Sequence, residues 1–365
     1  MKLVTVVGAR PQFIKAAALS RAMLARRGSG LSEVLVHTGQ HYDENMSNVF
    51  FEELGIGAPA YNLGIAGGTH GAMTGKMIEA LERVLLVERP DWVLIYGDTN
   101  STLAAALAAI KLHMPIAHVE AGLRSYNMRM PEEVNRIVAD RLSSLLLCPT
   151  ETAVANLAKE GLSNGVHLVG DVMYDVALYF AQVAEQRTSI LAQLGVTPKA
   201  YVLATCHRAE NTDDPENLAG VVRGLAGLAA SRPVVFPIHP RTRAKIQEYG
   251  LLGALGSVTV IEPLSYLDMV ALERHAAVIV TDSGGVQKEA FFYRVPCVTA
   301  RKETEWVETV SAGWNTLVGS DSARMIEAVN RHAQLERLEA NPYGAGDAAE
   351  RILNIMLRLA PACDR

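Results

Sequence analysis

Short runs of apolar, largely β-branched residues alternate along this chain with longer stretches in which apolar residues recur at helical spacing. In the first half, the runs that predict strands lie at 3–7, 33–37, 91–97, 115–119 and 144–149. Helical patterns lie at 11–27, 70–88, 99–112 and 131–143. In the second half, the strand runs lie at 201–205, 233–237, 257–262, 277–281 and 296–300. Continuous apolar strands that alternate with helices predict an α/β fold with parallel sheets covered on both faces.

The pattern restarts near residue 200, which predicts a second domain. Residues 185–199 are charged and helical and end in the turn LGVTPK before a new strand. The 365 residues also exceed the roughly 250–300 at which one hydrophobic core stops growing. We therefore expect two doubly wound, Rossmann-like domains, 1–185 and 186–345, with ligands bound where strand carboxyl ends of both sheets face a shared cleft. The last amphipathic helix, within 346–365, has an apolar stripe that must pack on one of them.

The charge balance argues against a general nucleic-acid binder, and the cysteines indicate the compartment in which the protein works. The 34 basic and 39 acidic residues give a net charge of −5, unlike the basic domains of general nucleic-acid binders. We find neither a signal peptide nor an apolar stretch of the ~20 residues that span a bilayer. The four cysteines (Cys148, Cys206, Cys297 and Cys363) are scattered without a C-x-x-C pair, which favours a reducing compartment. We expect a cytoplasmic protein that binds neither nucleic acid nor membrane.

The first turn between a strand and a helix, GARPQFIK (8–15), has the features of an anion site. Arg10 and Lys15 lie near the start of the predicted helix, where backbone N–H groups attract negative charge. The alternative is an ordinary turn with surface cations.

A second turn, DSGGVQKEA (282–290), is the more specific phosphate signal. Ser283, Gly284 and Gly285 can bring backbone N–H groups close to a diphosphate without a side chain in the way. Glu289 follows about one and a half turns later, where it can accept hydrogen bonds from ribose hydroxyls. The alternative is a glycine-rich turn that serves packing alone.

Carboxylates follow two neighbouring strands of the first domain. Asp98 lies in YGDTNST and Glu120 in HVEAGLRS, so both are expected at the same edge of the sheet. Glu132 and Glu133 begin the helix at 131–143. Converging carboxylates can supply a general acid and a general base. For Glu132 and Glu133 a purely structural role is a strong alternative, because acidic residues favour the first turn of a helix.

Two histidines follow strands of the second domain, His207 in ATCHRAENT and His239 in FPIHPRTR. Each can bind a phosphate or a hydroxyl, or it can be a satisfied structural histidine. The histidines and cysteines lack the spacing of metal ligands. The G-x-G-x-x-G dinucleotide fingerprint and the G-x-x-x-x-G-K-[ST] phosphate loop are absent. We therefore expect neither NAD nor a metal ion.

Seven motifs in order resemble the non-hydrolysing UDP-N-acetylglucosamine 2-epimerases over essentially the whole chain. They are GARPQFIK, GDTNS, HVEAGLRS, PEEVNR, CHRAEN, DSGGVQKEA and NPYGAGDAAERI. The resemblance implies a glycosyltransferase-B-like architecture, a last helix that crosses back to the first domain, and a homodimer. It also implies that UDP leaves C1 as the C2 proton is removed, and that UDP and a proton add back to the resulting 2-acetamidoglucal.

The resemblance further assigns roles to individual residues. The acid/base group consists of Asp98, Glu120 and Glu132, with His207 beside them in the catalytic set. UDP or substrate binding falls to Arg10, Lys15, Arg136, His207, Ser283, Gly284, Gly285 and Glu289. We add His239 to this set from its place at a strand end. Glu132 rather than Glu133 matches the family position, because it directly follows the proline.

Several departures from the commonest family pattern are similar to one subgroup. Gln12-Phe13 replaces Glu-Ala, Lys288 replaces an acid, and RKETEWVE (301–308) replaces a Thr-Glu-Arg-Pro-Glu run. These segments resemble the UDP-2,3-diacetamido-2,3-dideoxyglucuronate 2-epimerases of bacterial O-antigen synthesis. That substrate carries a C6 carboxylate, for which Arg129, Lys288 and Arg301 are available cations.

Other functions remain open at this point. UDP-N-acetylglucosamine is the alternative substrate. The alternative activities are a glycosyltransferase on the same two-domain frame, a hydrolysing 2-epimerase that releases the free sugar, and a UDP-sugar sensor without catalysis.

Overall fold

Both sheets in this computed structural model consist of parallel strands, as the alternation of apolar runs and helices predicts. The strand orders are β3-β2-β1-β4-β5-β6-β7 and β10-β9-β8-β11-β12-β13. Each chain path therefore starts at a central strand and winds outward on both sides, which is the doubly wound arrangement. The structure describes residues 1–26, 28, 30–40, 51, 54–332, 337–339 and 341–359.

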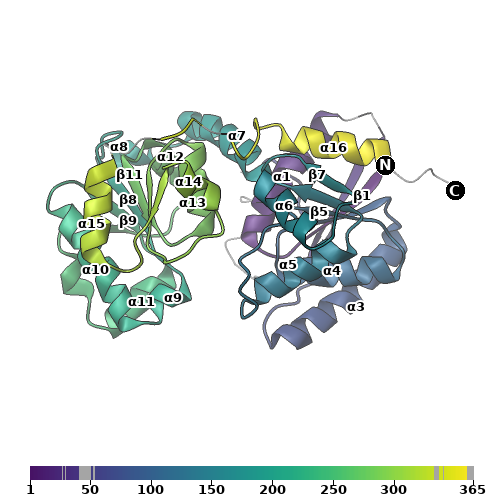
Figure 1. Cartoon of the computed structure of the whole chain (residues 1–365), viewed down its shortest axis with the longest axis horizontal. Coiled ribbons are helices and arrows are strands. Elements are labelled where there is room, and N and C mark those ends of the chain that lie inside the picture. The colour runs from purple at the N-terminus through teal and green to yellow at the C-terminus, as the bar shows by residue number, and fades with distance from the viewer. Residues whose placement is uncertain are drawn as a thin grey trace. The chain divides into compact units, whose positions relative to one another are not determined.

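The chain divides into two compact units, shown in Figure 1 with the element labels used below. The first unit comprises Met1–Val176 and Asn341–Arg365, and the second comprises Ala177–Ala340. The boundaries expected from the sequence, after 185 and after 345, lie a few residues beyond these divisions. The last helix belongs to the first unit, as the resemblance implies.

The strands of the first unit are β1 (Lys2–Val7), β2 (Ser32–His37), β3 (Tyr61–Asn62), β4 (Trp92–Tyr96), β5 (Ile116–Val119), β6 (Leu145–Cys148) and β7 (Val166–Leu168). Its helices are α1 (Arg10–Ala25), α3 (His70–Glu88), α4 (Asn100–Lys111), α5 (Pro131–Leu142), α6 (Glu151–Lys159) and α16 (Ala348–Leu359). The division between the units falls within α7 (Val172–Arg187).

The strands of the second unit are β8 (Val202–Thr205), β9 (Val234–Pro237), β10 (Thr259–Ile261), β11 (Val278–Thr281), β12 (Cys297–Thr299) and β13 (Asn315–Leu317). Its helices are α8 (Ile190–Leu194), α9 (Ala209–Thr212), α10 (Pro215–Ala229), α11 (Pro240–Glu248), the 3₁₀ turn η1 (Leu252–Leu255), α12 (Tyr266–His275), α13 (Gly284–Phe292), α14 (Val307–Ser311) and α15 (Ser322–Arg331).

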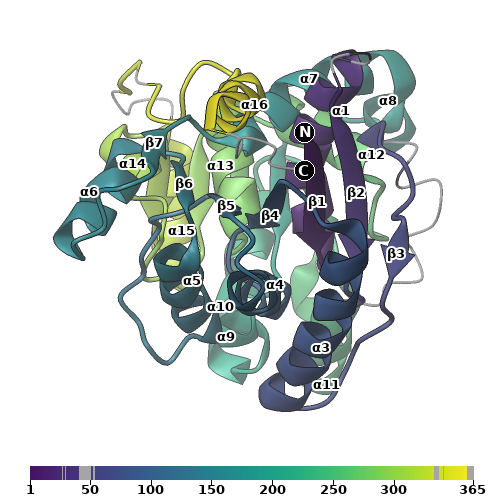
Figure 2. The same cartoon turned by 90° about the vertical axis from the view of Figure 1, so that its right-hand side faces the viewer.

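Helices α3, α4 and α5 cover one face of the first sheet, and α1 and α16 lie on the other (Figure 2). The buried cluster on the first face joins apolar side chains of β1, β2, β4 and β5 to α3 and to the alanines of α4. Small side chains let α4 pack closely on the sheet, and this holds the carboxyl ends of β4 and β5 in place.

Helix α16 is fixed to the first unit by polar contacts as well as by its apolar stripe. Asp175 accepts the backbone N–H groups of Ala348 at 3.1 Å and Ala349 at 2.8 Å, at the start of the helix. Burial raises the pKa of Asp175 to about 6, although these N–H groups favour its ionised form. Arg26 forms an ion pair with Glu350 in the same helix.

Glycines on α10 allow α15 to approach closely in the second unit. A Cβ atom on Gly220 would lie 2.1 Å from the carbonyl oxygen of Ser320. On Gly224 it would lie 2.6 Å from the sulfur of Met325, and on Gly227 2.5 Å from Cδ1 of Ile326. This face of α10 therefore packs against α15 and the turn before it.

No helix in the described part of the chain is long and apolar enough to cross a membrane. Cys148, Cys206 and Cys297 are free thiols in buried positions, and Cys363 lies outside the described residues.

The glycine contact on α10 predicts a position-specific loss of stability. We expect Gly220→Ala to lower the free energy of unfolding by about 1–3 kcal/mol, because the methyl group would overlap the Ser320 carbonyl. Gly75→Ala in α3 is the control, since its Cβ would meet no atom within 4 Å. It should raise the free energy of unfolding by about 0.5–1 kcal/mol. Urea unfolding followed by circular dichroism measures both, and equal stability of the two variants would contradict the packing argument.

Candidate active site

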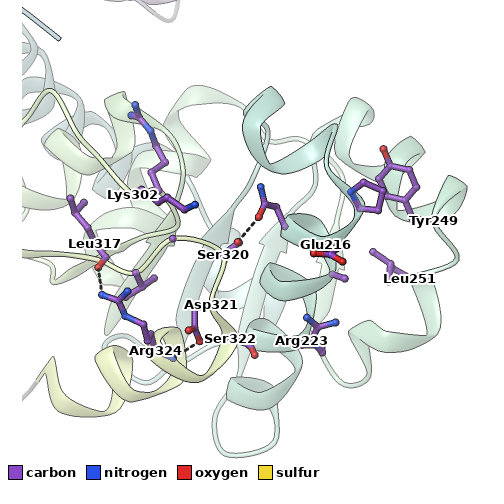
Figure 3. A pocket seen from close by; sticks show the side chains of 16 residues that line it. Glu216, Arg223, Tyr249, Leu251, Lys302, Leu317, Ser320, Asp321, Ser322 and Arg324 are labelled. Atoms are coloured by element: carbon purple, nitrogen blue, oxygen red, sulfur yellow. Dashed lines mark hydrogen bonds between the residues drawn. The ribbon is translucent and has the colours of Figure 1, made fainter. Parts of the chain in front are cut away.

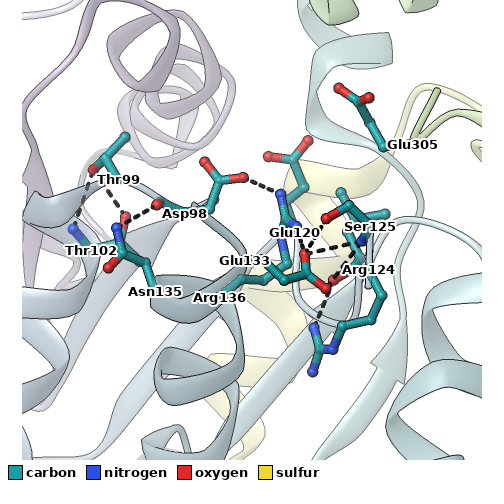
Figure 4. Close-up of polar contacts among 12 residues, drawn as sticks. Asp98, Thr99, Thr102, Glu120, Arg124, Ser125, Glu133, Asn135, Arg136 and Glu305 are labelled. Carbon is teal, nitrogen blue, oxygen red and sulfur yellow. Dashed lines mark hydrogen bonds and ion pairs between the residues drawn. The ribbon is translucent and has the colours of Figure 1, made fainter. Parts of the chain in front are cut away.

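The carboxyl ends of β4 and β5 bring Asp98 and Glu120 to one edge of the first sheet. The two strands pair in parallel, with Tyr96 opposite Val119, so the residues that follow lie side by side. Asp98 forms an ion pair with Arg136 of α5. Figure 4 shows Arg136 reaching from α5 to Asp98 on one side and to Glu133 on the other. Two of the predicted residues, Asp98 and Arg136, are therefore direct partners.

Glu120 is held in an unusual backbone conformation beside a cation. Its φ angle of 71° lies in the left-handed region, which costs about 1–2 kcal/mol for a residue with a side chain. Its carboxylate forms an ion pair with Lys15, and both side chains are mostly buried. A Cβ atom on Gly97 would lie 3.2 Å from the Glu120 carboxylate and 3.4 Å from Nζ of Lys15, so Gly97 leaves room for the pair. Strain at a well-packed polar position is typical of functional sites.

The start of α1 differs from the sequence prediction in one respect. Arg10 is the first residue of the helix, as expected. However, the backbone N–H groups of Gly8 and Ala9 donate to Oε1 of Gln12 at 2.8 and 3.1 Å. Gln12 is buried and also donates to the carbonyl oxygen of Tyr96 at 2.7 Å. The anion site predicted at this turn therefore loses two backbone donors to Gln12.

Glu132 and Glu133 have opposite environments at the start of α5. Glu133 is fully buried and accepts the N–H groups of Ser125 at 3.0 Å and Tyr126 at 2.9 Å, in addition to Arg136. Burial would raise the pKa of Glu133, but these N–H groups and Arg136 outweigh it and lower that pKa. Glu132 is exposed and forms no hydrogen bond or ion pair with the residues that the structure describes. Glu133 thus shapes the 125–126 turn, and Glu132 is the one open to a ligand.

In the second unit, a buried carboxylate that the sequence analysis did not single out organises the site. Asp282 is fully buried and accepts the N–H groups of His207 and Arg208, each at 3.0 Å. The side-chain amide of Asn211 donates to it at 3.0 Å. Because β8 and β11 are neighbours, Asp282 ties the loop after β8 to the glycine turn after β11. The only sequence signal was its place directly before Ser283.

The two predicted histidines lie next to each other, with ring centroids 6.0 Å apart. Loss of solvation among its neighbours is the main cause that lowers the pKa of His207, although nearby Asp282 opposes it, so the ring is neutral at pH 7. Its side chain is still 42% exposed and can be reached by a ligand. His239 has a structural use, because its Nδ1 accepts the N–H of Arg241 at 3.2 Å and caps α11. His207 is therefore the better placed of the two to bind a ligand.

The turn from Ser283 to Gly285 begins α13, with Ser283 as its N-cap. A Cβ atom on Gly284 would lie 2.6 Å from the carboxylate of Glu305, whereas on Gly285 it would lie 3.8 Å from Oγ of Ser283, an ordinary contact. Glu305 pairs with Arg301 at 3.0 Å and with Arg208 at 3.8 Å. The turn thus combines two glycines with two guanidinium groups that are paired with Glu305. A diphosphate bound here would compete with the Glu305 carboxylate for these cations.

Glu289 is buried on α13, close to a second buried acid, Glu273 of α12. Burial raises the pKa of Glu289 to about 7, although Lys288 and Tyr266 counter the shift. Burial, followed by the charge of Glu289, raises the pKa of Glu273 well above its usual value. The two acids therefore do not both ionise readily at neutral pH.

The cations considered for a substrate carboxylate lie in different places. Arg129 is exposed in the first unit. Lys288 and Arg301 are buried in the second unit. Nζ of Lys288 lies 4.0 Å from the ring centroid of Trp306, so two departures from the commonest family pattern are in direct contact.

The second unit also has a surface pocket of about 1040 Å³ (Figure 3). Its lining includes Arg301, Arg223, Lys302 and Arg324, together with Tyr249. None of the residues predicted to bind UDP or to act in catalysis lines it. Among the described residues, no group of three or more histidines, cysteines or acids could hold a metal ion.

Comparison with known proteins links this geometry to one family. A family model for UDP-N-acetylglucosamine 2-epimerase matches residues 23–357. The UDP-2,3-diacetamido-2,3-dideoxy-D-glucuronate 2-epimerase of Pseudomonas aeruginosa PAO1 is 51% identical over 364 residues, covering 98% of this chain and 100% of the relative.

Solved structures of enzymes with bound nucleotide agree with this chain in fold. The Methanocaldococcus jannaschii UDP-GlcNAc 2-epimerase in complex with UDP-GlcNAc and UDP has a TM-score of 0.89 at 43% identity, covering 98% of this chain and 100% of that one. The UDP-GlcNAc 2-epimerase of Neisseria meningitidis bound to UDP-GlcNAc has a TM-score of 0.87 at 32% identity, with coverage of 98% and 100%.

The buried acids of the second unit predict a pH-dependent effect of Glu273→Gln. A carboxyl group whose pKa is raised by folding stabilises the fold fully below its unfolded pKa and loses that contribution as pH rises through the folded value. Glutamine does not ionise, so Glu273→Gln avoids this loss. The midpoint temperature of the variant minus that of wild type should therefore increase by a few degrees from pH 5 to pH 8. Thermal unfolding at both pH values measures this. A difference that stays constant or shrinks toward pH 8 would show that Glu273 ionises normally.

Proposed function

Since the chain belongs to the UDP-N-acetylglucosamine 2-epimerase family, and is thus an isomerase with a glycosyltransferase-B-like fold, we propose that it inverts carbon 2 of UDP-2,3-diacetamido-2,3-dideoxyglucuronate. The observation that carries the choice of substrate is the full-length similarity to the Pseudomonas aeruginosa enzyme of that name. The product would be the manno epimer, a precursor of bacterial surface polysaccharide. UDP-N-acetylglucosamine is the second candidate, because related structures at lower identity contain it.

In the proposed reaction, a carboxylate of the first unit removes the C2 proton. The electron pair of the C2–H bond forms a C1=C2 double bond, and the C1–O bond breaks with its electrons on the diphosphate. UDP then adds back to C1 of the glycal while a second group delivers a proton to the other face of C2. The sequence is redox-neutral, because the electron pair that leaves the C2–H bond returns to it, so the reaction needs no NAD.

The acid/base group consists of Asp98, Glu120 and Glu132. Asp98 and Glu120 are candidates for the base, and each lies against a cation, Arg136 and Lys15 respectively. Glu132, which is exposed and without a partner among the described residues, is available to approach a bound sugar.

The second unit would bind the UDP part. Gly284 and Gly285 offer backbone N–H groups to the diphosphate, and the neutral ring of His207 can donate a hydrogen bond to it. Glu289 would accept from the ribose. His239 lies beside His207 and completes the binding set of this unit. Arg10 and Lys15 are the UDP-binding candidates of the first unit.

The uronate carboxylate adds one negative charge to the substrate, and the second unit carries cations that can meet it. Lys288 and Arg301 are buried there, and Arg301 adjoins the glycine turn through Glu305. A buried cation interacts more strongly with an incoming carboxylate than an exposed one such as Arg129.

We place this enzyme in the cytoplasm as a homodimer. The three described cysteines are free, which fits a reducing compartment. Homodimerisation follows the family resemblance, and light scattering of the purified protein tests it.

Proton NMR in D₂O tests the proposed reaction with each of the two UDP-sugars in turn. We expect deuterium at C2 together with the manno epimer, and a higher kcat/KM for the diacetamido-uronate. A higher kcat/KM for UDP-N-acetylglucosamine would contradict the proposed substrate. Release of UDP and a free sugar would identify a hydrolysing enzyme, and unchanged spectra despite UDP binding would favour a transferase or a sensor.

Substitution of the two paired carboxylates tests the acid/base assignment. Asp98→Asn and Glu120→Gln keep the side-chain shape but cannot accept a proton, so each should lower kcat by ~10²–10⁴. The affinity for UDP should change little. Glu151→Gln, an exposed acid of the same unit, is the matched control and should retain wild-type turnover. Wild-type rates in both Asp98→Asn and Glu120→Gln would remove these residues from the acid/base group.

A further inference from the structure

His118 is a fully buried imidazole whose two nitrogens both face oxygen atoms. Its Nε2 lies 2.7 Å from the carbonyl oxygen of Gly97, and its Nδ1 lies 2.7 Å from Oδ1 of Asp140. A carbonyl oxygen only accepts, so Nε2 must donate to Gly97. One ring therefore connects the end of β4, the end of β5 and helix α5.

Asp140 is fully buried and anchors the loop after β5 from α5. Its Oδ2 accepts the N–H of Gly122 at 3.1 Å and Nη1 of Arg124 at 2.7 Å. Burial would raise the pKa of Asp140, but His118 and Arg124 outweigh it and keep that pKa below its usual range. Asp140 is thus a carboxylate, and His118 donates to it from Nδ1.

These contacts surround the two proposed acid/base carboxylates without touching them. His118 precedes Glu120 by two residues and Gly122 follows it by two, so Asp140 holds the chain on both sides of the strained residue. Gly97 directly precedes Asp98. Because His118 binds Gly97, the same ring links the backbones that carry Asp98 and Glu120.

We propose that His118 and Asp140 are positioning residues that set the distance and orientation of the Asp98 and Glu120 carboxylates relative to each other. The inference rests on the acid/base roles proposed for those two residues. Proton transfer to and from one carbon requires both carboxylates in fixed places, and a displacement of about 1 Å can slow an enzyme by about 10²-fold. Substrate binding depends less on this spacing, so the effect should appear in kcat rather than in KM.

Two substitutions separate the two contacts of the ring. His118→Asn retains an N–H donor near the position of Nδ1 and loses the bond to Gly97. His118→Gln retains a donor near the position of Nε2 and loses the bond to Asp140. Each should lower kcat by about 10- to 100-fold, with KM and the UDP dissociation constant within about threefold of wild type. If one variant fails to fold, the other still decides the question.

Thr5→Val is the matched control for a general loss of stability in the first unit. Thr5 is fully buried on β1 and donates to Glu33 at 2.6 Å. Within the described part of the chain, it forms no hydrogen bond to the two carboxylates or to their anchors His118 and Asp140. It should lower the midpoint temperature and leave kcat unchanged. Equal losses of kcat in Thr5→Val and the His118 variants would overturn the proposal, as would wild-type kcat in the His118 variants.

Crystal structures of the variants give a readout that does not depend on turnover. We expect the Asp98 carboxylate to move in His118→Asn and the Glu120 carboxylate to move in His118→Gln. Carboxylates that keep their wild-type positions would overturn the positioning role. If the wild-type protein shows no C2 exchange, the proposed reaction fails, but these displacements still decide whether His118 sets the geometry.

Discussion

In each unit, a buried aspartate holds together the loops at the carboxyl ends of neighbouring strands, on which the candidate site depends. Asp140 binds His118, Gly122 and Arg124 in the first unit, and Asp282 binds the loop that carries His207 in the second. An ionised carboxylate without partners in a protein interior would be strongly destabilising. Each aspartate accepts from at least three donors, so its burial is tolerated. These hydrogen bonds also restrict the conformations of the loops that donate them. Because each buried charge must be satisfied for the unit to fold, the same hydrogen bonds also hold the loops of the candidate site in place.

The chain combines this rigidity with local strain. Glu120 adopts a left-handed backbone conformation, and the space for its ion pair with Lys15 exists because Gly97 has no side chain. In the second unit, the absence of a side chain on Gly284 likewise leaves room for the Glu305 carboxylate. At both places, a glycine lets charged side chains come close to the main chain. A methyl group at Gly284 would overlap the Glu305 carboxylate, and one at Gly97 would crowd Glu120 and Lys15 at 3.2 and 3.4 Å.

The sequence predicted the central architecture well because central parallel strands are continuous apolar runs. The missed strands β3, β7 and β13 all lie at sheet edges, where partial exposure removes that signal. Asp98, Glu120 and the glycine turn could be placed at strand ends from local order alone. The links from His118 to Asp140 and from Gln12 to Tyr96 could not, since they join segments 22 and 84 residues apart. Local patterns carry no information on which buried polar groups meet across such distances.

The pairing of charges in the first unit suits an elimination in which proton and leaving group depart together. If Glu120 is the base of the proposed reaction, it becomes neutral when it accepts the C2 proton, and Lys15 then has no negative partner in this ion pair. At that moment the diphosphate gains negative charge as the C1–O bond breaks. A cation whose partner is neutralised in the same step can stabilise the developing charge more strongly in the transition state than in the ground state. That difference, rather than tight binding as such, is what accelerates a reaction. If Asp98 is the base, the same argument applies to its ion pair with Arg136.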